Sequence, residues 1–340
     1  MIKPIEIFNI NPKAEEPVYL QIENAIIQSV ETGKLVQGEK LPSINKVCRE
    51  FSLAPGTVSR AYNNLVMRSV LVSRQGKGYY VGTSELVKEL NIFLLFDRLN
   101  AYKEVLYESF IHALGEKARV DVYFHHYREE VFARLIRENL GKYSHYVIMP
   151  HFNKDVSGLV EPIPPERLML IDKSIPSLKG KYSAVFQDFE NDIHDALLAG
   201  ISKLKKYSTI CLVSSSEGFQ FVPDGIRKGV KRFCRESGFA FTETSRLENS
   251  DITEGKVLLL FKDSDLIFAI GELNKRNLQA GKDVGLISFD DTPMKSVLNG
   301  GITVVSTDFR KMGETAASLL LENRKEMIKN PFSLILRNTL

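Results

Sequence analysis

Short apolar runs alternate with helical patterns across residues 91–340, and this alternation limits the fold more than any other feature of the sequence. Runs such as Ile92–Phe96, Leu168–Asp172 and Val257–Phe261 have the length of buried strands. Segments with apolar residues at helical spacing, such as Glu129–Asn139, lie between them. We therefore expect an α/β fold with doubly wound parallel sheets, whose ligands bind at the carboxyl ends of the strands. The last strand expected is Val304–Val305, and one long helix is expected at Asn191–Leu204.

The first 83 residues show a different pattern. A helix is predicted at Pro17–Thr32 and is followed by a stop signal. Ser43 is a favourable N-cap for a second helix, in which the apolar residues from Ile44 to Phe51 share one face. Pro55 suits the first turn of a third helix after a tight connection. Two short helices joined in this way predict a helix-turn-helix motif.

The third predicted helix and the segment after it are polar and basic. The outer face of the helix carries Gly56, Thr57, Ser59, Arg60 and Asn63. Residues 71–81 then predict a β-hairpin, a wing whose glycine-rich tip holds Arg74 and Lys77. Although the whole chain has a net charge of +3, residues 41–81 hold six basic side chains and one acidic one. This local charge predicts a DNA-binding surface, and the alternative is a solvated face without a partner.

The sequence of this region carries a family resemblance. Its motifs are Pro17-x-Tyr19-x-Gln21, Gly33-x-Leu35-x-x-Gly38-x-x-Leu41-Pro42-Ser43, Thr57-Val58-x-Arg60-Ala61-Tyr62 and Gly76-Lys77-Gly78. With this spacing they resemble the GntR-type winged helix-turn-helix. The resemblance implies that a homodimer binds double-stranded operator DNA, with Ser43, Asn45 and Pro55 beside the recognition helix. Asn45 and Pro55–Gly56 stand where the family commonly has arginine, so we expect a different base preference.

The last third of the chain carries a second resemblance. Gly281 to Asp291 (GKDVGLISFDD), Ile302 to Phe309 (ITVVSTDF) and Met312-Gly313-x-x-Ala316-Ala317 resemble the LacI/GalR-type effector domain. That domain has the two-lobed type I periplasmic-binding-protein fold. Together with a GntR-type head it resembles the AraR-type sugar repressors. The expected organisation is therefore a DNA-binding domain at 1–83, a linker at 84–90 and an effector-binding and dimerisation domain at 91–340.

This second resemblance also implies a ligand site. Its expected residues are Asp97, Tyr102, Asp188, Phe219, Lys262, Asp290 and Asp308. Carboxylates in such a site accept hydrogen bonds from neighbouring sugar hydroxyls, and aromatic rings can stack on the apolar face of a sugar. We therefore expect a ligand-responsive repressor of sugar-utilisation genes, which a sugar releases from its operator. Lys262 stands where the family has asparagine and would favour a phosphorylated sugar instead. A nucleobase or an amino-acid-like effector is a further alternative.

Several functional classes are excluded by the sequence. The three cysteines are widely spaced, His125, His126 and His151 lack partners at metal-ligand spacing, and we expect neither a metal nor a cofactor. Common catalytic and nucleotide-binding motifs are absent, so an enzyme is not expected. The chain starts without the basic and apolar pattern of a signal peptide and has no apolar run of membrane-spanning length. These features predict a cytoplasmic protein without a membrane partner.

Overall fold

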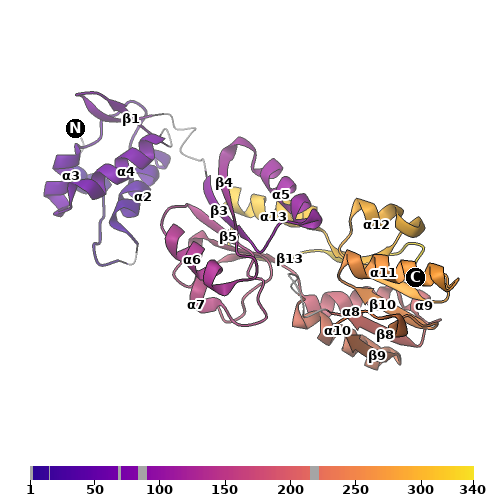
Figure 1. Cartoon of the computed structure of the whole chain (residues 1–340). Helices are drawn as coiled ribbons and strands as arrows, with labels where there is room; N and C mark the ends of the chain where they lie inside the picture. Colours follow the sequence, from indigo (N-terminus) through magenta and orange to yellow (C-terminus); the bar gives the residue numbers. More distant parts are fainter. Residues whose placement is uncertain (1–2, 15, 68–69, 83–89, 215–221) are drawn as a thin grey trace. The chain divides into compact units, whose positions relative to one another are not determined.

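The structure of the protein is a computed structural model. It describes residues 3–14, 16–67, 70–82, 90–214 and 222–340 (Figure 1). The chain divides into two compact units. The first unit comprises Met1–Ile92 with the short segments Glu116–Arg119 and Asn139–Ser144, and the second holds the remainder up to Leu340. The domain boundaries expected from the sequence stay predictions, because residues 83–89 lie outside the described residues.

The first unit contains the predicted helices and hairpin. After the short helix α1 (Pro4–Ile7) come the following elements: α2 (Val18–Glu31), α3 (Ile44–Phe51), α4 (Pro55–Met67), β1 (Leu71–Arg74) and β2 (Gly78–Val81). The two strands pair antiparallel, with Leu71 opposite Val81. Ile26, Val47, Val58 and Leu65 are fully buried in one shared core. Burial of these apolar faces explains why the polar side of α4 remains on the surface.

The turn between α3 and α4 follows from local chemistry. Ser43 caps α3, because its hydroxyl accepts a hydrogen bond from the backbone N–H of Lys46 at 3.3 Å. Ser52 ends that helix in the left-handed region, with a φ of 54°. Pro55 then begins α4, as predicted. The helix-turn-helix expected from the sequence is thus confirmed.

The second unit is built on two six-stranded sheets, each of which forms one lobe. Lobe 1 has the strand order β13-β7-β6-β5-β3-β4. Its strands are β3 (Leu90–Phe96), β4 (Ala118–Phe124), β5 (His145–Ile148), β6 (Leu168–Asp172), β7 (Ser183–Phe186) and β13 (Met327–Lys329). Its helices are α5 (Ala101–Leu114), α6 (Glu129–Asn139), α7 (Ser157–Val160) and α13 (Phe309–Leu321). As Figure 1 shows, α5 and α13 cover one face of this sheet and α6 and α7 the other.

Lobe 2 has the strand order β14-β12-β11-β10-β8-β9. Its strands are β8 (Thr209–Val213), β9 (Ala240–Thr244), β10 (Lys256–Leu260), β11 (Gly285–Phe289), β12 (Thr303–Thr307) and β14 (Phe332–Ile335). Its helices are α8 (Phe189–Ala199), α9 (Ile201–Leu204), α10 (Asp224–Ser237), α11 (Asp263–Lys275) and α12 (Pro293–Val297). All neighbouring strands pair parallel except β12 and β14. The predicted class of doubly wound parallel sheets is confirmed.

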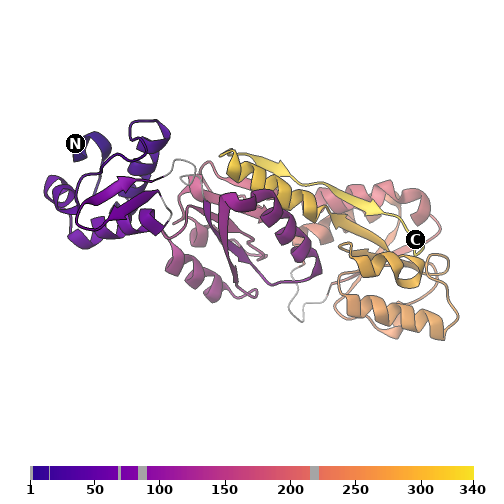
Figure 2. The same cartoon turned by 90° about the horizontal axis from the view of Figure 1, so that it is seen from above.

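The chain passes between the two lobes three times, after β7, after β12 and after β13 (Figure 2). Asn330, which is buried, ties these crossings together. Its backbone N–H donates to the carbonyl of Phe186 at 2.8 Å, and its side-chain amide donates to the Thr307 hydroxyl at 2.8 Å. The backbone N–H of Asp308 in turn donates to the carbonyl of Pro331 at 2.9 Å. Thr307 and Asp308 therefore lie at the hinge between the two lobes.

Two expectations about the elements of the second unit were wrong. The long helix expected at Asn191–Leu204 is divided at Gly200 into α8 and α9. A Cβ at Gly200 would lie 2.4 Å from a methyl group of Leu334, so glycine lets β14 approach closely. Strand β12 is not the last strand either, because β13 and β14 follow it and carry the chain back through lobe 1 to lobe 2.

Candidate functional site

The helix α4 presents the polar face that the sequence predicted. Pro55, Gly56, Arg60 and Asn63 are exposed, and Thr57 and Ser59 are half-buried. Ser43 and Asn45, at the start of α3, are exposed as well. The side chains thus form a continuous polar surface across the two helices of the motif, with the apolar residues of both helices turned into the core.

Two side chains of this surface are held in place by aromatic residues. The Arg60 guanidinium lies 3.9 Å from the centroid of the Tyr19 ring, within the range of a cation–π interaction. The hydroxyl of Tyr79 donates a hydrogen bond to the side-chain carbonyl of Asn63 at 3.3 Å, which links the wing to α4. Both contacts reduce the side-chain freedom that binding to a partner would otherwise remove.

The wing and the residue bridged to it carry three cations, two of which lie beside one tyrosine. Arg74 and Lys77 are exposed at the tip, and the Arg74 guanidinium lies 4.5 Å from the centroid of the Tyr80 ring. The ammonium of Lys40 lies 5.7 Å from the same ring. Lys40, which no sequence motif indicated, forms a β-bridge with Tyr80. Because Lys40 lies far from the hairpin in sequence, only the folded backbone reveals that it adds to this positive charge.

The second candidate site is a small cavity between the two lobes. Its volume is about 50 Å³, enough for a water molecule or two but not for a sugar ring. Lobe 1 lines it with Tyr102, His151, Asp172, Gln187 and Phe309. Lobe 2 lines it with Phe189, Pro223, Ile226, Phe261, Phe289, Asp290 and Phe332. The cavity lies at the carboxyl ends of β6, β7, β10 and β11, where an α/β fold binds its ligands.

Beneath the lobe 1 side of the cavity runs a chain of buried polar groups. The ammonium of Lys103 donates to one carboxylate oxygen of Asp97. His151 donates from Nδ1 to the other Asp97 oxygen and from Nε2 to Asp172, both at 2.7 Å. The side-chain amide of Gln187 donates to the second oxygen of Asp172. Because both ring nitrogens of His151 face carboxylates, the imidazole has to be protonated to satisfy both hydrogen bonds.

Two opposing effects set the pKa values of these hydrogen-bonded groups, namely burial and pairing with groups of opposite charge. Burial alone would raise the pKa of Asp97, but the charges of His151 and Lys103 hold it well below its usual range. Burial alone would lower the pKa of His151, but Asp97 and Asp172 raise it above 6.5. In Lys103 burial is the larger effect and lowers the pKa, with Asp97 opposing it. These hydrogen-bonded groups thus carry balanced charges and fix Asp172 at the cavity wall.

Asp290 faces the cavity from lobe 2 in a different environment. Burial raises the pKa of its carboxyl to about 7; the charge of Lys295 opposes this effect and that of Asp172 adds to it. The ammonium of Lys295 donates to the backbone carbonyls of Phe289 at 2.6 Å and of Asp290 at 2.9 Å. Within the described ranges, no group donates a hydrogen bond to the Asp290 carboxyl itself. This carboxyl therefore has its full accepting capacity available to a ligand.

Asp172 and Asp290 share an unusual backbone geometry. Both follow or end a strand with a positive φ, 69° for Asp172 and 61° for Asp290. Non-glycine residues in this left-handed region cost free energy and cluster at functional sites. Two aspartates from different lobes, held in this conformation at one cavity, are the strongest structural sign of a binding site in the second unit.

The structure brings only part of the predicted ligand site together. Tyr102 and Asp290 line the cavity, whereas Asp97 lies one hydrogen bond behind it, next to His151. Asp188 and Asp308 do not line it, because their carboxylates cap α8 and α13. Lys262 takes the N-cap position of α11 and is also absent from the lining. The remaining expected residue, Phe219, lies outside the described residues.

Sequence reasoning missed His151, Asp172 and Gln187 as a group and most of the phenylalanines. His151 was considered only as a metal ligand, and among the residues that the structure describes no group of three or more His, Cys, Asp or Glu side chains is arranged to hold a metal ion. Asp263 is the first residue of α11 and forms an ion pair with Lys295 at 3.2 Å. The feature of the sequence that could have indicated His151, Asp172 and Gln187 is that each is a polar residue at or after the end of a buried strand.

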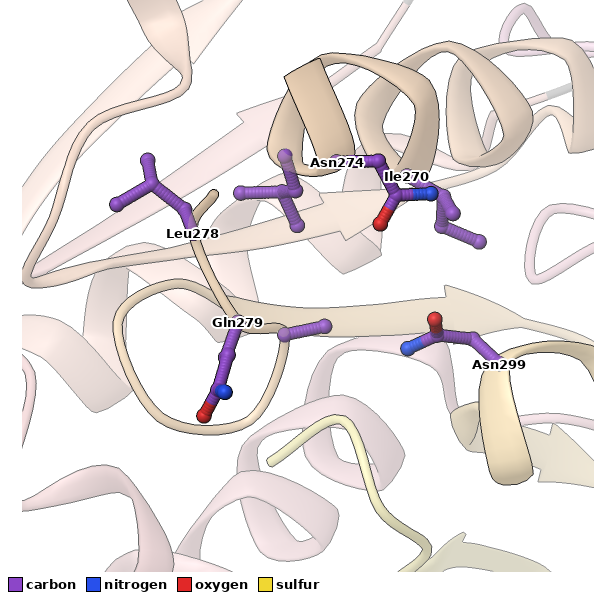
Figure 3. Close-up of a pocket in the computed structure, with 7 residues that line it drawn as sticks. Ile270, Asn274, Leu278, Gln279 and Asn299 are labelled. Carbon is purple, nitrogen blue, oxygen red and sulfur yellow. The ribbon is translucent and has the colours of Figure 1, made fainter. Parts of the chain in front are cut away.

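A second hollow lies on the surface of lobe 2, away from these aspartates. It has a volume of about 270 Å³ and is lined by residues of α11 and of the segments after it, including Ile270, Asn274, Leu278 and Asn299 (Figure 3). Its charged groups are few, and large apolar side chains are exposed near it. Ile267 of α11 is 57% exposed and Val297 of α12 is 75% exposed. Such a patch is typical of a protein–protein contact.

Comparison with known proteins finds a family model that matches part of each unit. Residues 18–81 match the family model of bacterial regulatory proteins of the gntR family, and residues 204–338 match a periplasmic binding protein-like domain. YhcF of Bacillus subtilis, an uncharacterized HTH-type transcriptional regulator, is 30% identical over 105 residues, which cover 31% of this chain and 80% of YhcF. YurK, another such regulator of B. subtilis, is 28% identical over 116 residues, which cover 34% of this chain and only 43% of YurK.

Solved structures of LacI family regulators share the fold of the second unit. A LacI family transcriptional regulator from Silicibacter pomeroyi has a TM-score of 0.61 at 17% identity, over 74% of this chain and 98% of that one. A LacI family regulator from Enterococcus faecium, with bound ribose, has a TM-score of 0.58 at 16% identity, over 73% of this chain and 98% of that one. Within the described ranges, no helix is long and apolar enough to cross a membrane.

Proposed function

Because this chain belongs to the gntR family of bacterial regulatory proteins and joins a DNA-binding domain to an effector domain, we propose that it represses sugar-utilisation genes and is released from DNA by a free sugar. A transcriptional regulator of this architecture needs two sites, one for operator DNA and one for the effector. One observation carries the choice of effector: the carboxyls of Asp172 and Asp290 face the same aromatic-lined cavity from different lobes.

In this structure the cavity is too small for a sugar ring, so the two lobes would have to move apart at the Asn330 hinge to admit one. The chemistry of the cavity walls supports a sugar. Carboxylates accept charge-assisted hydrogen bonds from hydroxyl groups, and two of them can hold several hydroxyls of one ring. Six aromatic rings line the same cavity and offer apolar faces for the carbon skeleton. The LacI family regulator from E. faecium whose fold is similar was solved with bound ribose. No lysine or arginine is among the described lining residues, so a phosphorylated sugar has less support.

The phenylalanines favour one second candidate. Phe261 and Phe289 lie parallel, with their ring centroids 3.9 Å apart and an interplanar angle of 7°. A planar nucleobase could extend such a stack, and an aspartate could accept hydrogen bonds from its N–H groups. A nucleobase is therefore the alternative effector, and it would leave the DNA-binding role unchanged.

The DNA contact is proposed to run along α4 and the wing. Arg60 and Asn63 would reach base edges in the major groove, together with Gly56, Thr57 and Ser59, because they lie on the exposed side of the second helix of the motif. Arg74 and Lys77 would contact phosphates or the minor groove. Pro55 and the start of α3, with Ser43 and Asn45, would lie against the DNA backbone.

We further propose that the protein is a homodimer held by its effector domains. Met294 and Val297 of α12 and Ile267 and Phe268 of α11 are exposed apolar side chains of lobe 2. Burial of such side chains against a second copy would be favourable. Ligand-driven movement of the lobes at the Asn330 hinge would then change the spacing of two DNA-binding domains.

The test is a titration of the purified full-length protein with free pentoses and hexoses, followed by calorimetry. We expect at least one sugar to bind, Asp290→Asn to weaken this binding strongly, and Asp188→Asn to leave it unchanged. The second variant is a matched control, because Asp188 caps α8 outside the cavity and asparagine caps a helix equally well. If nucleobases bind and no sugar does, the effector is a nucleobase, the second candidate. Loss of binding in Asp188→Asn but not in Asp290→Asn would place the site elsewhere.

A further inference from the structure

The two walls of the cavity differ in chemistry. The wall of lobe 1 is mainly polar and includes His151, Asp172 and Gln187, which are hydrogen-bonded to one another. Among the lining residues that the structure describes, those of lobe 2 are apolar apart from Asp290. Phe261 and Phe289, which are stacked on each other, form the centre of this second wall. A ligand held between the lobes thus meets hydrogen-bonding groups on one side and hydrocarbon on most of the other.

This asymmetry limits where a ligand can carry hydroxyl groups. Each lone hydroxyl placed against the wall of lobe 2 would lose its hydrogen bonds to water without a replacement, except beside Asp290. A methyl or methylene group in the same place would gain from burial. The walls therefore select a ligand with hydroxyls along one edge and an edge without hydroxyls opposite to it.

The charges of the cavity point to a neutral ligand. Lys103 is fully buried and donates to Asp97, and Lys295 is turned towards backbone carbonyls. His151 uses both ring nitrogens in hydrogen bonds to carboxylates. These cations are therefore already compensated inside the protein, and the groups that remain for a ligand are mainly acceptors. Such a set binds hydroxyl donors and offers little to a phosphate or a carboxylate.

From these walls we propose that the effector is a deoxy sugar, bound with its deoxygenated carbon against Phe261, Phe289 and Ile226 and with its hydroxyls towards Asp172 and Asp290. This inference rests on the proposed function, because it names the kind of sugar that the same cavity takes. Ile226, on α10, contributes the aliphatic part of the wall. Apolar pockets reject an analogue with one added hydroxyl by roughly 100-fold at most. We therefore expect the deoxy sugar to bind roughly 10- to 100-fold more tightly than its parent.

The experiment compares matched pairs of sugars by calorimetry on the full-length protein. The pairs are the 6-deoxy forms of glucose, galactose and mannose against their parents, in both the D and L series, and 2-deoxyribose against ribose. Each pair differs only in one hydroxyl. We expect at least one deoxy sugar to bind and to do so more tightly than its parent by the stated factor.

A pair of variants tests the wall itself. Ile226→Thr keeps a branched side chain but places a hydroxyl in the apolar wall, and we expect it to reduce the preference for the deoxy form by about tenfold or more. Val230→Thr is the control, because Val230 is buried on the same helix and does not line the cavity. It should lower stability in the same way and leave the preference unchanged.

The outcomes separate this inference from the proposed function. If a parent sugar binds as tightly as its deoxy form, or if Ile226→Thr leaves their ratio unchanged, the proposed function stands and the deoxy inference is wrong. If no free sugar of either kind binds, both are wrong. Binding only by sugar phosphates would likewise contradict the inference, because it requires a cation that the described lining residues do not present.

Discussion

The ionisation of Asp290 should make effector binding depend on pH. Burial raises the pKa of this carboxyl to about 7, so about one-tenth of the molecules carry the carboxylate at pH 6 and about nine-tenths at pH 8. Hydroxyl donors bind the carboxylate, and the apparent affinity scales with the fraction of protein in the binding-competent form. We therefore predict that the dissociation constant of a neutral sugar falls about tenfold from pH 6 to pH 8.

The assay is calorimetric titration at several pH values between 5.5 and 8.5, in buffers of different ionisation enthalpy. Because the ligand favours the ionised carboxyl, binding should release a fraction of a proton, which is largest near pH 6 and small at pH 8. Asp290→Asn should weaken binding at pH 8 by roughly 10- to 150-fold, the loss expected for a hydrogen bond to a charged group. The same variant should have a nearly flat pH profile. A flat profile in the unmodified protein, or the same slope in Asp290→Asn, would refute the reasoning.

The same raised pKa fixes the sign of an effect on stability. In the folded protein the carboxyl of Asp290 holds its proton more tightly than in the unfolded chain, so its ionisation costs stability as the pH rises from about 4 towards 7. A shift from 3.8 to about 7 corresponds to roughly 4 kcal/mol as an upper limit. Asp290→Asn should therefore raise the melting temperature of the ligand-free protein at pH 8 and change it little at pH 4.

Four further predictions concern the rest of the molecule. Lys77→Ala should weaken DNA binding about equally for all sequences and lower the salt dependence by about one released ion, measured by anisotropy at several salt concentrations. Gly313→Ala should cost about 1–3 kcal/mol in urea unfolding, because its Cβ would lie 2.1 Å from the Ser109 hydroxyl oxygen where α13 packs on α5. Lys103→Met should cost about 3–5 kcal/mol, since it removes one partner of a buried ion pair. The pKa of His151 is raised in the folded protein, so the stability that its ion pairs contribute is complete below about pH 6.5 and is lost as the pH rises through the pKa of the folded state. In His151→Gln, this part of the pH dependence of unfolding should vanish in denaturation curves.

Much of the fold could be predicted because it depends on local patterns. The period of apolar residues indicated α2, α3 and α4, and one of the apolar runs indicated the strand Leu168–Asp172 with correct bounds. The crossing segments were missed because they are short: β13 has three residues, and β14 has four. Such strands carry no readable period, and their positions are set by hydrogen bonds around Asn330 that form only in the folded chain.

The cavity was predicted less well because its chemistry depends on residues far apart in sequence. His151 bonds to Asp97, 54 positions earlier, and to Asp172, 21 positions later, and no local motif signals either contact. Asp188 looked equivalent to a ligand aspartate, but α8 begins at the next residue and its carboxylate turns back to cap that helix. Asp290 was predicted because it lies in a longer motif that fixes its position at the end of β11.

The measurement that tests the central claim most directly is the coupling between operator and effector. Operator DNA is first selected from a random library with the full-length protein, and its affinity is then measured with and without saturating sugar. The affinity of the sugar is measured in turn with and without the operator. We predict that the sugar weakens DNA binding and that DNA weakens sugar binding by the same factor, because linkage requires it. Equal operator affinity with and without the bound sugar would contradict the account.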